Sequence, residues 1–263
     1  MQDEFPQLGK RQQRGSKPRC HLLTHGTSLD VAARLTSLIQ PWGVVRPTDC
    51  WMPSGFERCA EAQLHTASGI LPKRANREAL RDWWLAIATE RTATPNIDIA
   101  STCLVQGKEG ILLIEAKAHD YELRKEEQGK KLDDDSSEDS GKNHRQIGLA
   151  IEAANASLSK ETKLPWSLSR DTRYQMSNRF GWAWKLTELG IPVILAYLGF
   201  TNCEEMRKGK QQQPIASHEE WEGLVRRHSQ PLFPKEVWNQ ESRVHGQSFI
   251  PLILTYNQPL SRV

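Results

Sequence analysis

Three charged side chains, Asp98, Glu115 and Lys117, stand in stretches of sequence that are otherwise mostly apolar. Two carboxylates held a few ångströms apart repel each other, and a divalent cation with oxygen ligands relieves that repulsion. Mg²⁺ bound there would keep several waters, lower the pKa of one of them and stabilise the charge that develops on a phosphodiester under attack. Lys117 would orient or help deprotonate that water, or neutralise the phosphate. These residue types therefore predict hydrolysis of a nucleic-acid backbone.

The segment that carries these residues is predicted to be a β-hairpin. Residues 97–105 and 111–118 are rich in β-branched and apolar residues, and Gln-Gly-Lys-Glu-Gly separates them. Both faces of the second stretch begin apolar, which indicates a central strand. Charged groups at the end of such a strand carry a desolvation cost unless they pair or bind an ion.

The register of the hairpin decides whether the three charges meet. With a two-residue turn centred on Gly107 and Lys108, Asp98 lies directly opposite Lys117 and diagonal to Glu115 on the same face. A loop longer by one residue would move Asp98 to the opposite face. The predicted site therefore depends on the turn.

Other segments show helical or strand periodicity around the hairpin. Thr27 is the predicted N-cap of the first helix, and Pro41 ends that helix. Together the periodic segments predict an α/β (α+β) fold, with a mixed sheet flanked by helices. The further predicted elements are helices at about 57–67, 77–89, 144–158, 174–189 and 218–228, and strands at 192–200 and 249–256.

Two charged segments are predicted to lie outside the packed core. Residues 1–22 form a basic, mobile tail, and residues 120–145, with many charges and few apolar side chains, form a mobile acidic loop. Residues 23–263 are then a single domain. The acidic loop would gate access to the site, become ordered on binding, or be an incidental insertion.

Two short motifs give the chain a resemblance to a known family. Pro-Asn-Ile-Asp at 95–98, a short hairpin, and Glu-Ala-Lys at 115–117 resemble the PD-(D/E)XK nuclease superfamily. The resemblance implies a restriction-endonuclease-like αβββαβ core at about 75–200, with N- and C-terminal elaborations. Two departures stand out: Pro95 lies three residues before Asp98 rather than beside it, and the first core strand has no clear counterpart.

The resemblance also implies roles for individual residues. Asp98 and Glu115 become ligands of Mg²⁺ or Mn²⁺, with the backbone carbonyl of Ala116 as a further ligand. Lys117 becomes the catalytic base or the stabiliser of charge. The reaction implied is metal-dependent cleavage of nucleic acid, as by a DNA endonuclease.

Further residues are candidates for the site or for contacts to nucleic acid. Members of that superfamily often add a carboxylate from a preceding helix, for which Glu61 and Glu78 are candidates, although a solvated helix position explains either one better. Some also place a glutamine where Gln146 stands. Trp182 and Trp184 are predicted to pack in the core rather than to stack on bases. Basic residues near the 174–189 helix are candidate phosphate contacts, with a plain solvated helix face as the alternative: Arg170, Arg173, Arg179 and Lys185.

Composition limits the classes of partner. A formal net charge of +3 and a pI near 8.6 mean that any affinity for phosphate must be local. The five cysteines are scattered without a C-x-x-C pair, which fits a reducing cytoplasm. No apolar run predicts a signal peptide or a membrane span. The expected partner is nucleic acid, DNA rather than RNA, bound by a homodimer or by a subunit of a larger DNA-processing complex.

Two alternatives stay open at this point. A non-catalytic nucleic-acid-binding or assembly module would keep the same fold and use its basic residues for contacts. A hydrolase of some other phosphodiester would keep the metal and change the substrate. Dependence on metal separates the first alternative from the others.

Overall fold

The computed structural model describes residues 8, 12–89, 92, 94–133 and 135–260, which form one mixed sheet with helices on both faces. Its α-helices are α1 (Ser16–Leu23), α2 (Ser28–Ile39), α3 (Arg74–Trp84), α4 (Asp120–Lys125), α5 (Glu138–Thr162), α6 (Tyr174–Glu188) and α7 (His218–Ser229), with short 3-10 turns η2 (Glu204–Met206) and η3 (Lys235–Val237). Its strands are β1 (Gly43–Val44), β2 (Trp51–Met52), β3 (Ile99–Val105), β4 (Lys108–Lys117), β5 (Val193–Phe200), β6 (Ser242–Val244) and β7 (Gln247–Tyr256).

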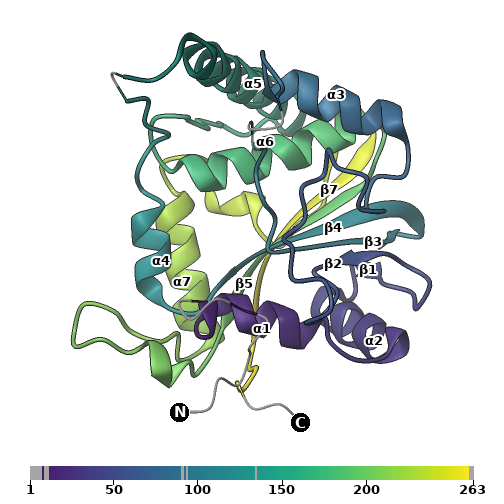
Figure 1. The fold of residues 1–263 in the computed structure, drawn as a ribbon, viewed down its shortest axis with the longest axis vertical. Helices are drawn as coiled ribbons and strands as arrows, with labels where there is room; N and C mark the ends of the chain where they lie inside the picture. Colours follow the sequence, from purple (N-terminus) through teal and green to yellow (C-terminus); the bar gives the residue numbers. More distant parts are fainter. Residues whose placement is uncertain (1–7, 9–11, 90–91, 93, 134, 261–263) are drawn as a thin grey trace.

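The sheet runs in the order β1-β3-β4-β5-β7-β6, and β2 also pairs with β3 (Figure 1). Strands β3 and β4 are antiparallel, whereas β5 lies parallel to both β4 and β7. Every residue of β5 is buried. A parallel strand covered on both faces is expected to be continuously apolar, and β5 has that composition. The predicted mixed α/β architecture is confirmed at this level.

Alternate side chains along the central strands pack into two separate hydrophobic cores. Leu113 and Leu195 pack on one face, in a cluster that includes residues of α3, α5, α6 and α7. Leu112 and Ile194 pack on the other face, against residues of α1 and α2. Figure 1 shows α3, α5 and α6 on one side of the sheet and α1 and α2 on the other. The two-residue repeat of a strand explains the division, because neighbouring side chains point to opposite faces.

The turn between β3 and β4 differs from the predicted turn. Its two central residues are Gln106 and Gly107, with φ of 50° and 78°, as a type I′ turn requires. The strands therefore pair two residues away from the expected register. Continuing the observed register sets Asp98 across from Glu115, so the predicted Lys117 partner was wrong. A shift of two residues keeps Asp98 on the expected face of the sheet.

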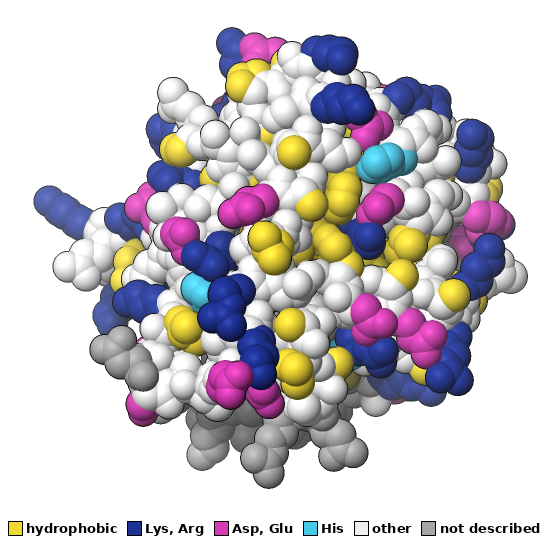
Figure 2. Space-filling view, turned by 90° about the horizontal axis from the view of Figure 1, so that it is seen from above, with side chains coloured by type: hydrophobic (Ala, Val, Ile, Leu, Met, Phe, Trp, Pro, Cys, Tyr) yellow, Lys and Arg dark blue, Asp and Glu magenta, His cyan; other side chains and the backbone are white. Residues whose placement is uncertain are grey.

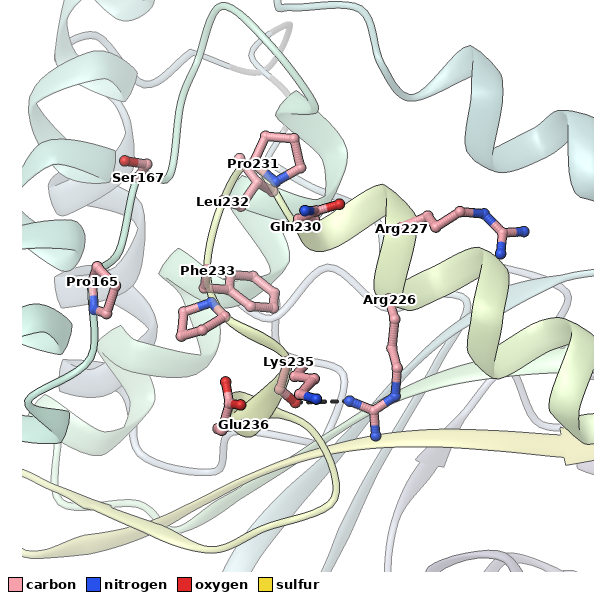
Figure 3. Close-up of a pocket in the computed structure, with 11 residues that line it drawn as sticks. Pro165, Ser167, Arg226, Arg227, Gln230, Pro231, Leu232, Phe233, Lys235 and Glu236 are labelled. Atoms are coloured by element: carbon pink, nitrogen blue, oxygen red, sulfur yellow. Dashed lines mark hydrogen bonds between the residues drawn. The ribbon is translucent and has the colours of Figure 1, made fainter.

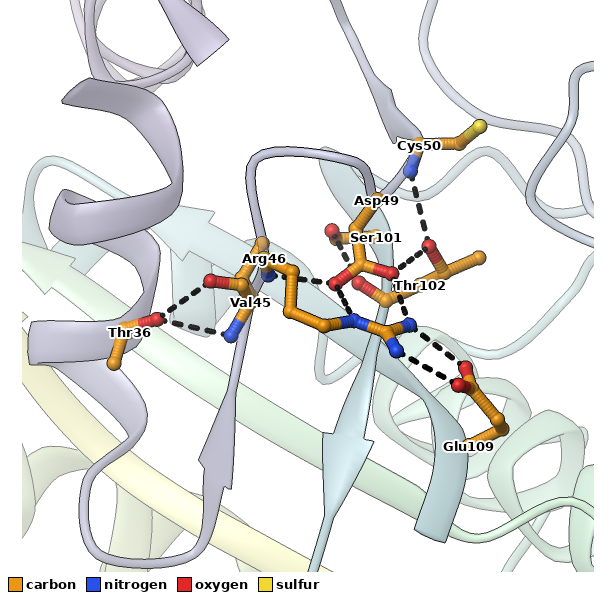
Figure 4. Close-up of polar contacts among 8 residues, drawn as sticks. All are labelled: Thr36, Val45, Arg46, Asp49, Cys50, Ser101, Thr102 and Glu109. Carbon is orange, nitrogen blue, oxygen red and sulfur yellow. Dashed lines mark hydrogen bonds and ion pairs between the residues drawn. The ribbon is translucent and has the colours of Figure 1, made fainter. Parts of the chain in front are cut away.

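A polar cluster fixes the edge of the sheet where β1 and β2 meet β3 (Figure 4). Arg46 binds Asp49 and Glu109, with nitrogen to oxygen distances of 2.8 Å in both ion pairs. Asp49 accepts a further hydrogen bond from the Thr102 hydroxyl at 2.9 Å. The segment that joins β1 to β2 is thus tied to β3 and β4, which explains how two-residue strands hold their place.

Several predicted elements match the structure, and three do not. Thr27 caps α2, which ends before Pro41, and the later strands and helices α6 and α7 lie close to their predicted bounds. Helix α3 ends at Trp84 instead of residue 89, and α5 extends over Glu138–Thr162 instead of 144–158. The helix expected at 57–67 is absent: this described segment consists of turns and extended residues, with Ala62 bridged to Ile97. Within the expected mobile tail, residues 16–22 belong to α1, whose Arg19 and Cys20 are buried. Most of residues 1–11 lies outside the described residues.

The expected mobile acidic loop at 120–145 is also largely helical. Asp120–Lys125 forms α4, and α5 begins at Glu138. Ser137 caps α5 through its side chain, and two acidic residues in the first turn favour that end of a helix. No described helix is both long enough and apolar enough to cross a bilayer.

Candidate active site

The structure brings Asp98, Glu115 and Lys117 together at one end of the β3–β4 hairpin. Glu115 and Lys117 lie near the end of β4, are 1% and 5% exposed, and form an ion pair with each other. Asp98 precedes β3 and accepts a 2.8 Å hydrogen bond from the backbone N–H of Ala116 through Oδ2. The backbone of one strand therefore fixes the carboxylate beside the other.

Helix α6 holds Glu115 from the opposite side. Arg179 Nε donates to Oε2 of Glu115 at 2.5 Å, and Gln175 Nε2 donates to Oε1 at 2.5 Å. Residues four apart on a helix lie on one face, so Gln175 and Arg179 reach the same carboxylate. Burial alone would raise the pKa of Glu115, but Arg179 and Lys117 hold that pKa below its ordinary value. Glu115 is thus a buried, ionised carboxylate.

Lys117 lies between two carboxylates, because Glu126 approaches it at 2.5 Å in addition to Glu115. Glu126 is 6% exposed and follows α4. Burial opposes the charged form of Lys117, yet the two carboxylates raise the pKa of Lys117 well above its ordinary value. Burial raises the pKa of Glu126 to about 7 although Lys117 opposes this rise. The arrangement keeps Lys117 protonated at neutral pH, so it suits a cation better than a base.

Asp98 faces a cavity of about 420 Å³ and is partly exposed there. Burial, with the neighbouring Glu115 carboxylate as a further cause, raises the pKa of Asp98 to about 8. The ionised form of Asp98 is therefore not fully stabilised by the cations of the chain. The residues that line this Asp98 cavity are Glu61, Thr94, Pro95, Asn96, Asp98, Lys130, Tyr174, Gln175, Asn178 and Arg179.

A second cavity, of about 430 Å³, opens on Lys117 and shares Tyr174 and Gln175 with the first. Its other lining residues come from α4 and the segment that follows it: Glu122, Lys125, Glu126, Gln128 and Gly129. The start of α6 thus separates two openings, one toward Asp98 and one toward Lys117.

The segment after α4 is pinned against the segment before α6. Residues 127–130 run beside residues 170–174, joined by an isolated β-bridge and by backbone hydrogen bonds of 2.8 to 3.3 Å. A Cβ added at Gly129 would lie 2.2 Å from the carbonyl oxygen of Asp171, so only glycine permits this approach. The segment that was predicted to be mobile therefore carries Glu126 and Lys130 to fixed positions on either side of the site.

Replacing Gly129 with alanine should force these two segments apart. We expect a loss of about 1 to 3 kcal/mol in the free energy of unfolding, as for other overpacked sites, measured by urea denaturation. Gly141→Ala is the matched control, because a Cβ there meets nothing within 4 Å and alanine favours the helix. Equal stability of Gly129→Ala and the native chain would show that the close approach is not maintained in solution.

The carboxylates of the site are candidate ligands for a divalent cation. No three described His, Cys, Asp or Glu side chains form a group that could hold a metal ion by themselves. Mg²⁺ needs only one or two carboxylates and keeps several waters, and Asp98 and Glu115 supply oxygen atoms of the right kind. The raised pKa of Asp98 means that its ionised form is poorly stabilised in the free chain, and a bound cation would supply that stabilisation. The residues fit Mg²⁺, provided that Glu115 shares oxygens already bound by Arg179 and Gln175.

The other predicted site residues are divided between the site and the scaffold. Glu61 lines the Asp98 cavity and pairs with Lys17 at 2.9 Å, whereas Glu78 pairs with Arg74 on the surface. Gln146 donates to the carbonyl of Trp83, which ties α5 to the end of α3, and it lines neither cavity of the site.

The basic residues near α6 also differ in what they contact. Arg179 is buried against Glu115, so it is not free to bind phosphate. Arg173 lies before α6, 3.9 Å from Glu127. Lys185 pairs with Glu188, and Arg170 pairs with Asp171. Trp182 and Trp184 are buried, which confirms that they pack in the core.

Three residues at the site were not predicted from the sequence: Glu126, Gln175 and Lys130. Gln175 carried a usable signal, because it stands four residues before Arg179 in a predicted helix. Glu126 and Lys130 carried none, because their neighbours in sequence are charged and polar and resemble a solvated loop.

A cavity of about 640 Å³, larger than either cavity of the site, lies elsewhere (Figure 3). It is formed by the end of α7, the following loop and two residues before α6, and it shares no lining residue with the Asp98 cavity. Arg226 there donates to Glu222 and to the carbonyl of Lys235, both at 2.8 Å. Its lining includes Pro231, Phe233 and Glu236, with no cluster of carboxylates against a buried lysine. Size alone therefore does not locate the chemistry.

Comparison of the chain with protein-family models, with curated proteins and with solved structures gave no match. Only the chemistry of the site residues therefore supports a function.

Proposed function

We propose that this chain is a metal-dependent nuclease that hydrolyses phosphodiester bonds, with DNA as the expected substrate. The observation that carries the proposal is the set of Asp98, Glu115 and Lys117 at the end of the hairpin, next to an open cavity. Burying charged groups such as Glu115 and Lys117 is costly unless they are paired or used.

The proposal assigns a step to each residue of this set. Asp98 and Glu115 would hold Mg²⁺ or Mn²⁺, which when bound supplies Lewis acidity and lowers the pKa of a water. Lys117, kept protonated by Glu115 and Glu126, would stabilise the negative charge that builds up on the phosphoryl oxygens during attack. Arg179 and Gln175 would keep Glu115 in position while the substrate binds.

The proposal extends to the restriction-endonuclease-like core. Helix α2, the short strands β1 and β2, strands β3 and β4, the helices α5 and α6, and the parallel strand β5 follow one another, with α3 inserted before β3 and α4 before α5. This order is compatible with an αβββαβ core that begins before the expected residue 75. The short strands would then take the place of the first core strand, which had no clear counterpart in the sequence.

The surface supports local binding of substrate over coating of nucleic acid. On the face shown in Figure 2, which lies uppermost in Figure 1, Lys and Arg side chains are mixed with acidic, hydrophobic and uncharged side chains, and several of them gather at the lower left. The described side chains of this face form no continuous basic surface. Phosphate affinity would therefore come from cations placed at the site, as the small net charge of +3 also requires.

One observation favours a second candidate, a non-catalytic nucleic-acid-binding or assembly module. Both oxygens of Glu115 are already bonded within the chain, so the carboxylate is satisfied without a metal. The same experiment separates the two candidates.

Cleavage of supercoiled, linear and single-stranded DNA and of RNA should be measured with Mg²⁺, with Mn²⁺ and with EDTA. We expect cleavage that requires metal and falls at least about 100-fold in Asp98→Asn, which removes one charge but keeps the acceptor for Ala116. Glu109→Gln, a change at the exposed start of the same hairpin strand, is the control. If the native chain is inert on every substrate and binds nucleic acid as Asp98→Asn does, the binding module replaces the nuclease.

A further inference from the structure

Lys130 occupies a fixed position in the segment after α4. Its backbone N–H donates to the carbonyl of Arg170 at 2.8 Å, and its own carbonyl accepts a 2.8 Å hydrogen bond from Nε2 of His144. Gly129, one residue earlier, lies against the backbone of Asp171. The main chain at Lys130 is therefore held from α5 on one side and from the segment before α6 on the other.

The side chain of Lys130 is half-buried in the Asp98 cavity. Its ammonium group lies 5.3 Å from the centre of the Tyr174 ring, a distance at which the ring stabilises a cation. Among the described residues, no carboxylate lies within ion-pair distance of Lys130. This contrasts with Lys117, which is flanked by two carboxylates, and with Lys17, which is paired with Glu61.

A half-buried ammonium without a counterion is unfavourable, and burial lowers the pKa of Lys130 accordingly. An anion that entered the cavity would offset this cost. The other cation that lines the cavity, Arg179, is already committed to Glu115. Among the described residues that line this cavity, Lys130 is therefore the cation that remains available to a bound anion.

We propose that Lys130 binds a phosphate group of a nucleic-acid strand lying in the Asp98 cavity, next to the phosphate that is cut. The inference rests on the proposed function for the identity of the anion, a phosphodiester. The Tyr174 ring packs against the ammonium group, and Asn178 adds a polar side chain to the lining of the same cavity. Lys130 is thus a substrate-binding residue that takes no part in the chemical step.

The test measures binding separately from cleavage. The dissociation constants of fluorescent single- and double-stranded oligonucleotides are measured by anisotropy in Ca²⁺ over a series of salt concentrations. Lys130→Gln should weaken binding about 5- to 20-fold, and the slope of log K against log salt should shrink by about 0.7 to 0.9, as expected for one lost phosphate contact. Lys130→Arg should restore both values. Lys160→Gln, an exposed lysine on α5, controls for the loss of one positive charge.

The outcomes separate this inference from the proposed function. Lys130-dependent binding by a chain that cuts nothing would uphold the phosphate contact and refute the nuclease. Active cleavage, with Lys130→Gln equal to the native chain in affinity and salt slope, would refute the contact and leave the nuclease standing. A native chain that binds no oligonucleotide would also overturn the contact, as would an equal effect of Lys160→Gln.

Discussion

Replacing Lys117 with methionine should lower the rate of nucleic-acid cleavage at least about 100-fold while leaving affinity for nucleic acid within a few-fold of the native chain. Methionine keeps the length of the side chain and removes its charge. The loss falls on the rate because the ammonium is held by Glu115 and Glu126 inside the chain, where it meets the developing charge of the reacting phosphoryl group. Single-turnover cleavage and anisotropy measure the two effects separately.

The same substitution also leaves Glu126 buried without its cation, so stability must be controlled. Removing one partner of a buried pair destabilises a fold by about 3 to 5 kcal/mol. The double variant Lys117→Met, Glu126→Gln removes the stranded charge as well, and it should recover much of the free energy of unfolding without recovering cleavage. Native cleavage rates in the double variant would refute a role for Lys117 in the reaction.

Replacing Arg179 with methionine should lower the free energy of unfolding by about 3 to 5 kcal/mol at neutral pH. Glu115 would then be a buried carboxylate without its most important counterion, because the positive charge of Arg179 contributes most to keeping Glu115 ionised despite its burial. Urea denaturation measures the change. Arg145→Met, an exposed position on α5, is the matched control and should leave the midpoint unchanged.

The pH dependence of the Arg179→Met defect has a definite sign. In the native chain the pKa of Glu115 is depressed, so its contribution to stability is present above the ordinary pKa of glutamate and is lost as pH falls through the depressed value. Without Arg179, burial raises the pKa of Glu115 relative to the native chain, and protonation of Glu115 relieves the variant as pH falls. The stability gap between variant and native chain should therefore narrow on acidification. A difference in stability that does not change with pH would show that the defect comes from lost packing and not from the unpaired charge.

The apolar patterns of the sequence predicted the framework of the site. Strands β4, β5 and β7 and helix α6 stand where their periodicity predicted them, because burial on both faces leaves a continuous apolar stretch and burial on one helix face leaves a 3.6-residue repeat. Asp98 and Glu115 could be placed together because they flank a hairpin. The register of the hairpin could not be predicted, because Gln106 adopts a positive φ, which its residue type does not indicate.

Contacts between distant segments escaped prediction for a different reason. Glu126 meets Lys117 only because α4 turns the chain back toward the end of β4, and a charged segment without apolar periodicity gives no sign of that path. The need for glycine at position 129 could not be predicted either, because it arises from the backbone of Asp171, far along the chain. Arg179 was predicted near the site for its charge, but the structure shows it bound to Glu115, which no local pattern specifies.

Strand β5 pairs in parallel along its whole length with β7, and helix α7 packs Trp221 against Gly199, near the end of β5. The part of the chain that carries the proposed chemistry ends near Phe200, but a fragment cut there would expose the bare hydrogen-bonding edge of a fully apolar strand. Such edges recruit other strands and promote aggregation. The part of the chain needed to fold this site is therefore longer than the motif itself. A recombination event that joined a foreign segment after β5 would have to supply a strand that pairs with β5.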